Sequence, residues 1–392
     1  MATFNSEDLF LSRAKFVMKY MGVWIQPLNE SLLSKCYRYL MVTLQYMFLI
    51  FQLIYIFQVW GDMEAIVQAS YLMFTQSCLC FKVAIFLFNP DNIRQLIAQM
   101  NSEIFKPQNL VHQNFLRDQA TWIKRMLMGF MISAQCTCVL WAVRPLFDGI
   151  GRKFPFDMWM PLSPESSLQY IIGYVFQLMT ISMSASMYFG VDSVAMPAVM
   201  FACAQVQIIK DKILRVSPVT LNVKAADRQK LFEDNHKRLN ECIQQHQAVY
   251  TFTKLVEQTF HAYLLFQMSG CVGIFCMTSL RMLGIGWRSV QFFSSLTYML
   301  VMFTQLFVCC KCGHELTSMT EELHREMYKC SWYEQDLNFK RKLCFTMMRM
   351  SRPIVIRAGY YIPLSRQTFV GILRMSYSYF AVLNQANRVE QQ

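Results

Sequence analysis

The chain has 392 residues, of which 54% are hydrophobic and 16% are charged, and the apolar residues occur in long blocks. This composition exceeds what one soluble core needs and predicts a polytopic membrane protein. The net charge of +12 comes from lysines and arginines dispersed between the blocks, not from an aromatic-interleaved basic patch, so we expect no nucleic-acid partner.

The N-terminal stretch does not resemble a secretory signal peptide. Glu7, Asp8, Arg13 and Lys15 interrupt its apolar residues, whereas a signal peptide needs an unbroken apolar core. We therefore expect the N-terminus to stay in the cytosol.

Seven blocks are candidates for membrane-spanning helices, because a bilayer core of about 30 Å requires roughly 20 apolar residues per helix. Six of them are strongly apolar and cover residues 39–60, 66–88, 126–147, 167–188, 255–282 and 289–312. The seventh covers residues 367–385 and carries Arg374 at its middle. Because an arginine at that depth is costly against lipid, this helix is expected to line something other than lipid.

The loops between the blocks set a direction for the chain. Most of the 37 lysines and arginines precede the first block or follow the second, fourth and sixth blocks. Positively charged loops stay cytoplasmic, so the prediction is an all-α membrane protein of seven helices with a cytosolic N-terminus and an extracellular C-terminus. This is the reverse of a G-protein-coupled receptor, and no G protein is expected to be required.

Helices are also predicted outside the membrane. Apolar residues recur at near-helical spacing before the fifth block, for example Leu239, Cys242 and Ile243, and an amphipathic pattern ends at Pro353. Together they predict a cytoplasmic anchor domain where subunits meet. The expected division is residues 1–200 (N-terminal segment and first four crossings), 201–255 (helical extension), 256–312 (next two crossings), 313–365 (anchor helices) and 366–392 (last helix and short tail).

Candidate chemical groups give little support for an enzyme. Cys309, Cys310, Cys312 and His314 are zinc-ligand types, but without a partner cluster we favour packing or lipidation of the thiols. No metal, cofactor or catalytic motif is expected. Lys82 and Asp192 lie in or near apolar blocks, and for both we expect a solvated position at the membrane boundary.

The seventh helix separates two faces. At 100° per residue, the residues within about 80° of one another are Gln367, Gly371, Arg374, Ser378, Val382 and Gln385. Phe369, Ile372, Leu373, Phe380 and Leu383 share the far side. This stripe is either a polar seam between helices or the wall of a water-filled conduit with Val382 as an apolar constriction. A conduit would need several subunits around one axis.

The C-terminal quarter resembles the insect odorant receptor family. The resemblance is carried by Gln305, Phe307, Cys310 and Gly313 in QLFVCCKCG, by MYKCSWYE, and by Arg352-Pro353, Gly359, PLS and SYSYF further on. The FPFDMWMP segment, residues 154–161, also fits.

The resemblance implies a tuning subunit of an odorant-gated, non-selective cation channel in the plasma membrane, assembled as a heterotetramer with the olfactory co-receptor. It places a gate on Val382 and a pore mouth on Gln385, with Ser378 on the same face. It implies an odorant pocket in the outer half of the bundle, in the part that residues 1–200 largely supply. The pocket candidates are Tyr71, Leu72, Phe74, Ala134, Cys138, Trp141, Tyr170, Tyr174, Gln177, Leu178, Ile181, Tyr298 and Met302.

The expected ligand is a small volatile, particularly an aromatic one, held by shape and dispersion together with one hydrogen bond. For any single candidate, ordinary packing of the bundle is an equally good explanation. The alternatives are a gustatory receptor of the same inverted plan and a transporter, although no inverted repeat or broken helix pair supports the latter.

Overall fold

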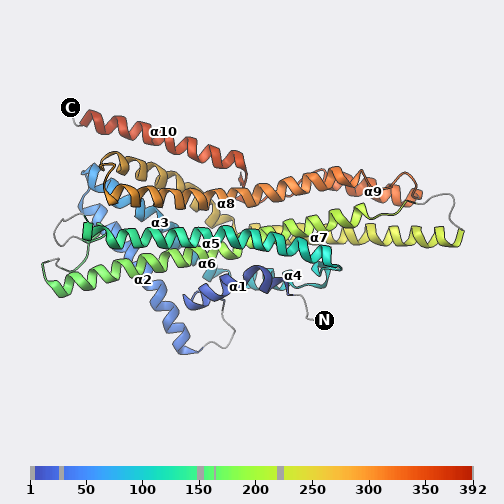
Figure 1. Ribbon diagram of the computed structural model, residues 1–392, viewed down its shortest axis with the longest axis horizontal. Helices are drawn as coiled ribbons and strands as arrows, with labels where there is room; N and C mark the ends of the chain where they lie inside the picture. The colour runs from blue at the N-terminus through green and yellow to red at the C-terminus, as the bar shows by residue number, and fades with distance from the viewer. Residues whose placement is uncertain (1–4, 26–30, 148–153, 163–164, 219–224, 391–392) are drawn as a thin grey trace.

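The computed structural model describes residues 5–25, 31–147, 154–162, 165–218 and 225–390, and it is built mainly of long helices (Figure 1). The elements in chain order are α1 (Ser6–Tyr20), α2 (Leu32–Gln58), α3 (Met63–Phe88), α4 (Pro90–Met100), η1 (Glu103–Phe105), α5 (Leu110–Phe147), α6 (Ser167–Leu214), α7 (Ala225–Leu283), α8 (Val290–Met327), α9 (Leu337–Met350), β1 (Arg357–Ala358), β2 (Ile362–Pro363) and α10 (Arg366–Glu390).

Six helices of the described part are long and apolar enough to cross a membrane: α2, α3, α5, α6, α7 and α8. The seventh helix, α10, packs along α7 and α8 (Figure 1). Helix α10 is not counted among them, because polar and charged residues such as Gln367, Arg374 and Asn384 interrupt its apolar sequence. The predicted all-α membrane fold is confirmed.

Helix α6 forms the centre of the bundle. Its most apolar stretch is completely buried, and it packs against α1, α5, α7 and α8. Small residues such as Ala195, Ala198 and Ala202 are fully buried on it, and small side chains allow helix backbones to approach closely. The central position of α6 therefore follows from its composition.

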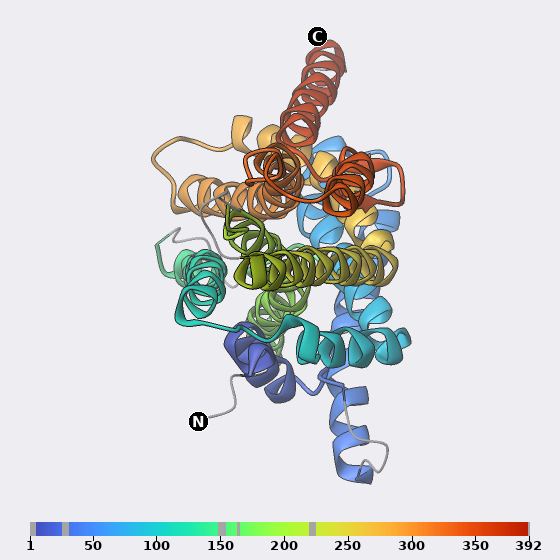
Figure 2. The same cartoon turned by 90° about the vertical axis from the view of Figure 1, so that its right-hand side faces the viewer.

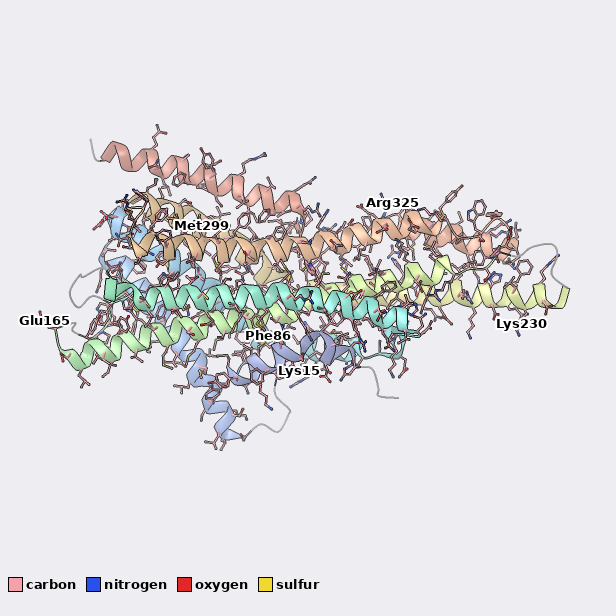
Figure 3. The ribbon with its side chains drawn as sticks, in the orientation of Figure 1. Lys15, Phe86, Glu165, Lys230, Met299 and Arg325 are labelled. Carbon is pink, nitrogen blue, oxygen red and sulfur yellow. The ribbon has the colours of Figure 1, made fainter. Side chains whose placement is uncertain are left out.

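Several helices extend well past their apolar stretches. Helix α7 begins at Ala225, about thirty residues before the apolar block that starts at Leu255, and α8 continues to Met327. Figure 3 shows Lys230 near one end of the molecule, which we call the anchor end, and Glu165 near the opposite end, which we call the loop end. The helical extensions are confirmed as helices, whereas residues 219–224 lie outside the described part.

A short ribbon after α9 was not predicted. Pro353 ends the helical run, and the following residues form β1 and β2, paired antiparallel. The turn between them needs Gly359 at φ +59°, and the Gly359 N–H donates to the His261 carbonyl at 2.9 Å. The buried Glu257 carboxylate accepts from the Arg357 N–H at 2.9 Å. The ribbon thus ties the start of α10 to α7.

Helix α10 lies at one edge of the molecule, opposite the beginning of α2 (Figure 2). One face of α10 packs on the bundle: Phe369 lies against Phe303 at a ring distance of 5.0 Å, and Phe380 and Leu383 cover the small cluster around Cys276. The predicted apolar side is therefore the side that packs.

Candidate functional site

A cavity lies between α3, α5, α6 and α8 and has a volume of about 60 Å³. Its walls are mostly apolar and aromatic, as ligand pockets usually are. The lining residues are Leu72, Thr75, Gln76, Phe130, Ala134, Thr137, Cys138, Trp141, Ile181, Ser184, Ala185, Tyr188, Tyr298, Val301, Met302 and Gln305.

Seven of the thirteen pocket candidates lie together on this cavity, and they come from all four helices. They are Leu72, Ala134, Cys138, Trp141, Ile181, Tyr298 and Met302. The aromatic wall is continuous, because the Trp141 ring lies 5.6 Å from the Tyr298 ring and packs edge-on against Phe156 at 5.1 Å.

Two further candidates lie behind the wall. Tyr71 packs edge-on against Tyr298 at 5.4 Å, and the Arg281 guanidinium lies 4.2 Å from the Tyr71 ring centre. The Phe74 ring lies where a side chain on Gly273 would stand, 3.1 Å from the position of its Cβ. Tyr71 therefore supports the cavity wall from outside, whereas Phe74 packs on α7.

The remaining four candidates lie nearer the loop end of α6 and do not line the cavity. Tyr170 and Tyr174 form an aromatic row with Phe154, and the Tyr174 hydroxyl donates to the Ala142 carbonyl. Leu178 is half-buried. The Gln177 amide accepts from the Phe156 N–H at 3.0 Å and donates to the Phe156 carbonyl at 3.1 Å. Gln177 therefore fixes Phe156 against Trp141.

Sequence reasoning missed several polar lining residues. Gln76 donates to Gln45 at 2.8 Å, and the Ser184 hydroxyl donates to the same Gln45 oxygen at 2.6 Å. These three residues tie α2, α3 and α6 together beside the cavity. The available signal was a glutamine and a serine inside strongly apolar blocks, where an unpaired polar group is expensive and a partner is therefore expected.

The expectation for Lys82 and Asp192 was wrong. The Lys82 side chain is fully buried, and its Nζ lies 2.7 Å from Asp192 Oδ1. The ammonium also lies 4.3 Å and 5.1 Å from the ring centres of Tyr188 and Tyr263. The pair is internal because α3 and α6 bring the two charges together, so neither has to reach water.

The pair is linked to the cavity by Gln305. Gln305 Nε2 donates to Asp192 Oδ2 at 2.6 Å, and Gln305 itself lies on the cavity wall. Tyr188, whose ring contacts the Lys82 ammonium, also lines the cavity. A buried charge pair thus stands directly behind the apolar site.

The polar stripe of α10 faces away from the rest of the chain. Val382 is 66% exposed, and Ser378 and Gln385 are also exposed. The Ser378 hydroxyl donates to the Arg374 carbonyl of its own helix at 3.0 Å. Within one chain, the stripe is therefore not a seam between helices.

The cysteines at the end of the sixth apolar block are packed inside the bundle. Cys309, Cys310 and Cys312 are all buried. In the part of the chain that the structure describes, no three His, Cys, Asp or Glu residues gather as they would around a metal ion. The burial of the three thiols favours packing over lipidation.

Comparison with known proteins decides the family. The model of the 7tm Odorant receptor family matches residues 62–377, which is most of the chain. The chain belongs to the insect odorant receptor family. The odorant receptor is accordingly a multi-pass protein of the plasma membrane, and the match favours an odorant receptor over a gustatory receptor or a transporter.

Relatives extend the similarity over nearly the full length. Odorant receptor Or1 of Anopheles gambiae is 22% identical over 388 residues, covering 93% of each chain. Odorant receptor 2a of Drosophila melanogaster is 26% identical over 270 residues, covering 66% of this chain and 64% of its own. The solved olfactory receptor OR5 of Machilis hrabei, in complex with eugenol, superposes with a TM-score of 0.83 at 12% identity, covering 96% and 97% of the two chains. That likeness establishes the same fold for this odorant receptor.

Proposed function

We propose that this odorant receptor is the odorant-binding subunit of a ligand-gated, non-selective cation channel. The observation that carries the proposal is the cavity between α3, α5, α6 and α8, whose walls include Trp141, Tyr188 and Tyr298. Aromatic and aliphatic walls bind a small volatile, preferably an aromatic one, through shape and dispersion. The six other sequence candidates act around the cavity as supports.

The ion path in this proposal is formed by α10. Its polar stripe is exposed, with Ser378 and Gln385 on it and Val382 as the apolar constriction. A single helix cannot enclose a pore, so the stripe is expected to face copies of α10 from other subunits around one axis. The proposed partner is the olfactory co-receptor in a heterotetramer, joined through the anchor end.

The proposed gating follows from the size of the cavity. Its volume of about 60 Å³ is well below the roughly 300–1,000 Å³ of typical ligand pockets. An odorant therefore fits best when the helices stand further apart. A ligand that prefers the wider arrangement shifts the population toward it, and α8, which contributes Tyr298 and Met302, also packs against α10.

The proposed orientation has a cytosolic N-terminus and anchor end, and an extracellular C-terminus. It rests on the basic residues that gather toward the anchor end of the long helices, and it leaves no role for a G protein in opening the channel.

The test is expression of the full chain in cells with and without the co-receptor, with recording of whole-cell current during application of volatile panels. Cation current that needs both the volatile and this chain is the expected result. A response that is absent for every volatile, while a direct co-receptor agonist still evokes current, would contradict the proposal. Current that saturates like carrier flux would instead favour a transporter.

A further inference from the structure

Two polar atoms of the cavity-lining residues have no hydrogen-bond partner within the described part of the chain. They are Trp141 Nε1 and Gln305 Oε1. Trp141 is only 4% exposed and Gln305 only 5%. Buried polar groups are nearly always paired, and an unpaired one weakens the folded state. An indole donor and an amide acceptor are thus left for something that enters the cavity.

The orientation of the Gln305 amide is fixed from behind. Gln305 Nε2 donates to Asp192 Oδ2 at 2.6 Å, while Asp192 Oδ1 lies 2.7 Å from Lys82 Nζ. An ionised carboxylate only accepts hydrogen bonds. Turning the amide over would place its carbonyl oxygen against the carboxylate, so the NH₂ group must face Asp192. The carbonyl oxygen is left over as an acceptor.

The other polar side chains near the cavity already have partners. The Ser184 hydroxyl donates to Gln45 at 2.6 Å, and the Thr137 hydroxyl donates to the Ser133 carbonyl at 2.9 Å. The Tyr298 hydroxyl bonds with the Thr75 hydroxyl and donates to the Tyr71 carbonyl at 3.2 Å. They have little left to offer a ligand.

We propose that Gln305 selects a compact odorant that carries a hydroxyl group, an alcohol or a phenol. The hydroxyl donates to Gln305 Oε1. A methyl group or an ether oxygen in its place has no proton to donate and leaves Oε1 unpaired. Asp192 and Lys82 are positioning residues, since they act through the amide. This inference deepens the proposed function and rests on it.

The receptor should prefer a ligand with a hydroxyl group to one without it, because a buried polar atom left without a partner costs more than a satisfied hydrogen bond gains. A site built to bond a hydroxyl rejects the analogue that lacks it more strongly than an apolar site rejects an added hydroxyl. One such bond predicts a difference in potency of about tenfold or more.

The test uses ligand pairs of equal size that differ by hydroxyl against methyl: phenol and toluene, benzyl alcohol and ethylbenzene, cyclohexanol and methylcyclohexane. Each is applied to cells that express the full chain with the co-receptor, and the half-maximal concentration for current is compared within each pair. We expect the hydroxyl member to act at a concentration at least about tenfold lower. Equal potency within every active pair would overturn the inference while leaving the proposed function intact.

The variant Gln305→Leu tests the assigned acceptor. We expect the potency ratio within a pair to fall toward one, because the hydroxyl ligand loses its partner while the hydrocarbon loses nothing. A general disturbance of the fold would weaken both members alike. Gln305→Met serves if the leucine variant does not reach the cell surface.

Gln52→Leu is the matched control. Gln52 is a second buried glutamine with an unpaired Oε1, and it does not line the cavity. We expect this variant to keep the wild-type potency ratio.

A wild-type potency ratio in Gln305→Leu would contradict the assignment of Gln305 as the hydroxyl acceptor. The proposed function would be refuted as well if cells with the wild-type receptor gave no current to the six compounds or to any other volatile, although a direct co-receptor agonist still evoked current.

Discussion

Lys82 of α3 and Asp192 of α6 form an ion pair with an N–O distance of 2.7 Å in the interior of the helix bundle. Burying two charges is costly, and the pair tolerates it because Gln305 donates to the second carboxylate oxygen and two tyrosine rings lie near the ammonium. The pair joins three helices that surround the candidate odorant cavity. We infer that this ion pair holds α3, α6 and α8 in the arrangement that forms the cavity.

Removing one charge of this pair should destabilise the receptor strongly. We expect Lys82→Met to cost about 3–5 kcal/mol, because it leaves Asp192 buried without its cation. The double variant Lys82→Met with Asp192→Leu should recover most of that loss. Lys106→Met, which removes a partner of the exposed Glu103, should change stability by less than about 1 kcal/mol. Thermal unfolding of the purified protein measures all three, and a double variant no better than the single one would contradict the argument.

The contact between Gly313 and Leu364 predicts a second loss. A Cβ on Gly313 would stand 2.2 Å from the Leu364 Cβ and 2.8 Å from its carbonyl oxygen. Gly313→Ala should therefore push the ribbon off α8 and lower stability by about 1–3 kcal/mol. Gly129→Ala is the control, since nothing lies within 4 Å of its Cβ position. A helical alanine there should be neutral or stabilising, and equal melting temperatures for the two variants would refute the steric explanation.

The sequence predicted the crossings well because each depends on the composition of one segment. It also predicted the packed face of α10, since Phe369 and Phe380 share one side of a single helix. It could not predict the ion pair of Lys82 and Asp192, because that pair depends on how two distant helices are placed. The ribbon at Arg357–Ala358 was missed for a different reason, since strands of two residues carry almost no sequence pattern. Tyr170 and Tyr174 share a helix face with the lining residue Ile181 but lie two to three turns nearer the loop end, and the sequence does not show how far along α6 the cavity extends.

Cysteine labelling tests the proposed orientation. Cys344 is exposed on α9, whereas Cys330 is buried and its surroundings raise the pKa of its thiol to about 11. At neutral pH, Cys344 should react with a maleimide and Cys330 should not, because the thiolate is the reactive form. Because Cys36 and Cys136 are exposed as well, the experiment uses the Cys36→Ser, Cys136→Ser double variant. In that background a membrane-impermeant maleimide should reach Cys344 only after permeabilisation, and a further Cys344→Ser change should remove the signal. Labelling of Cys344 in intact cells to the same extent as in permeabilised cells would contradict the proposed orientation.

Val382 tests the proposed gate. Val382→Ala should widen the apolar constriction and raise the basal leak or alter ion selectivity. Val139→Ala is a suitable control, since Val139 is 60% exposed on α5 and lies away from the α10 stripe. Whole-cell current without ligand and reversal potentials under changed ion gradients give the readout. Wild-type leak and selectivity in Val382→Ala would remove this residue from the gate.

The odorant cavity is tested most directly by filling it. Ala134 lies on the cavity wall and is 8% exposed, so Ala134→Leu should occupy the space that the ligand needs. Ala98→Leu makes the same change at an exposed position of α4. The decisive measurement is the odorant dose–response of whole-cell current from each variant together with the co-receptor. We predict at least a tenfold loss of odorant potency in Ala134→Leu. Current evoked by a direct co-receptor agonist should be unchanged in that variant, and Ala98→Leu should respond to the odorant like the wild type. An unaltered odorant response in Ala134→Leu would contradict the assignment of the cavity as the odorant site.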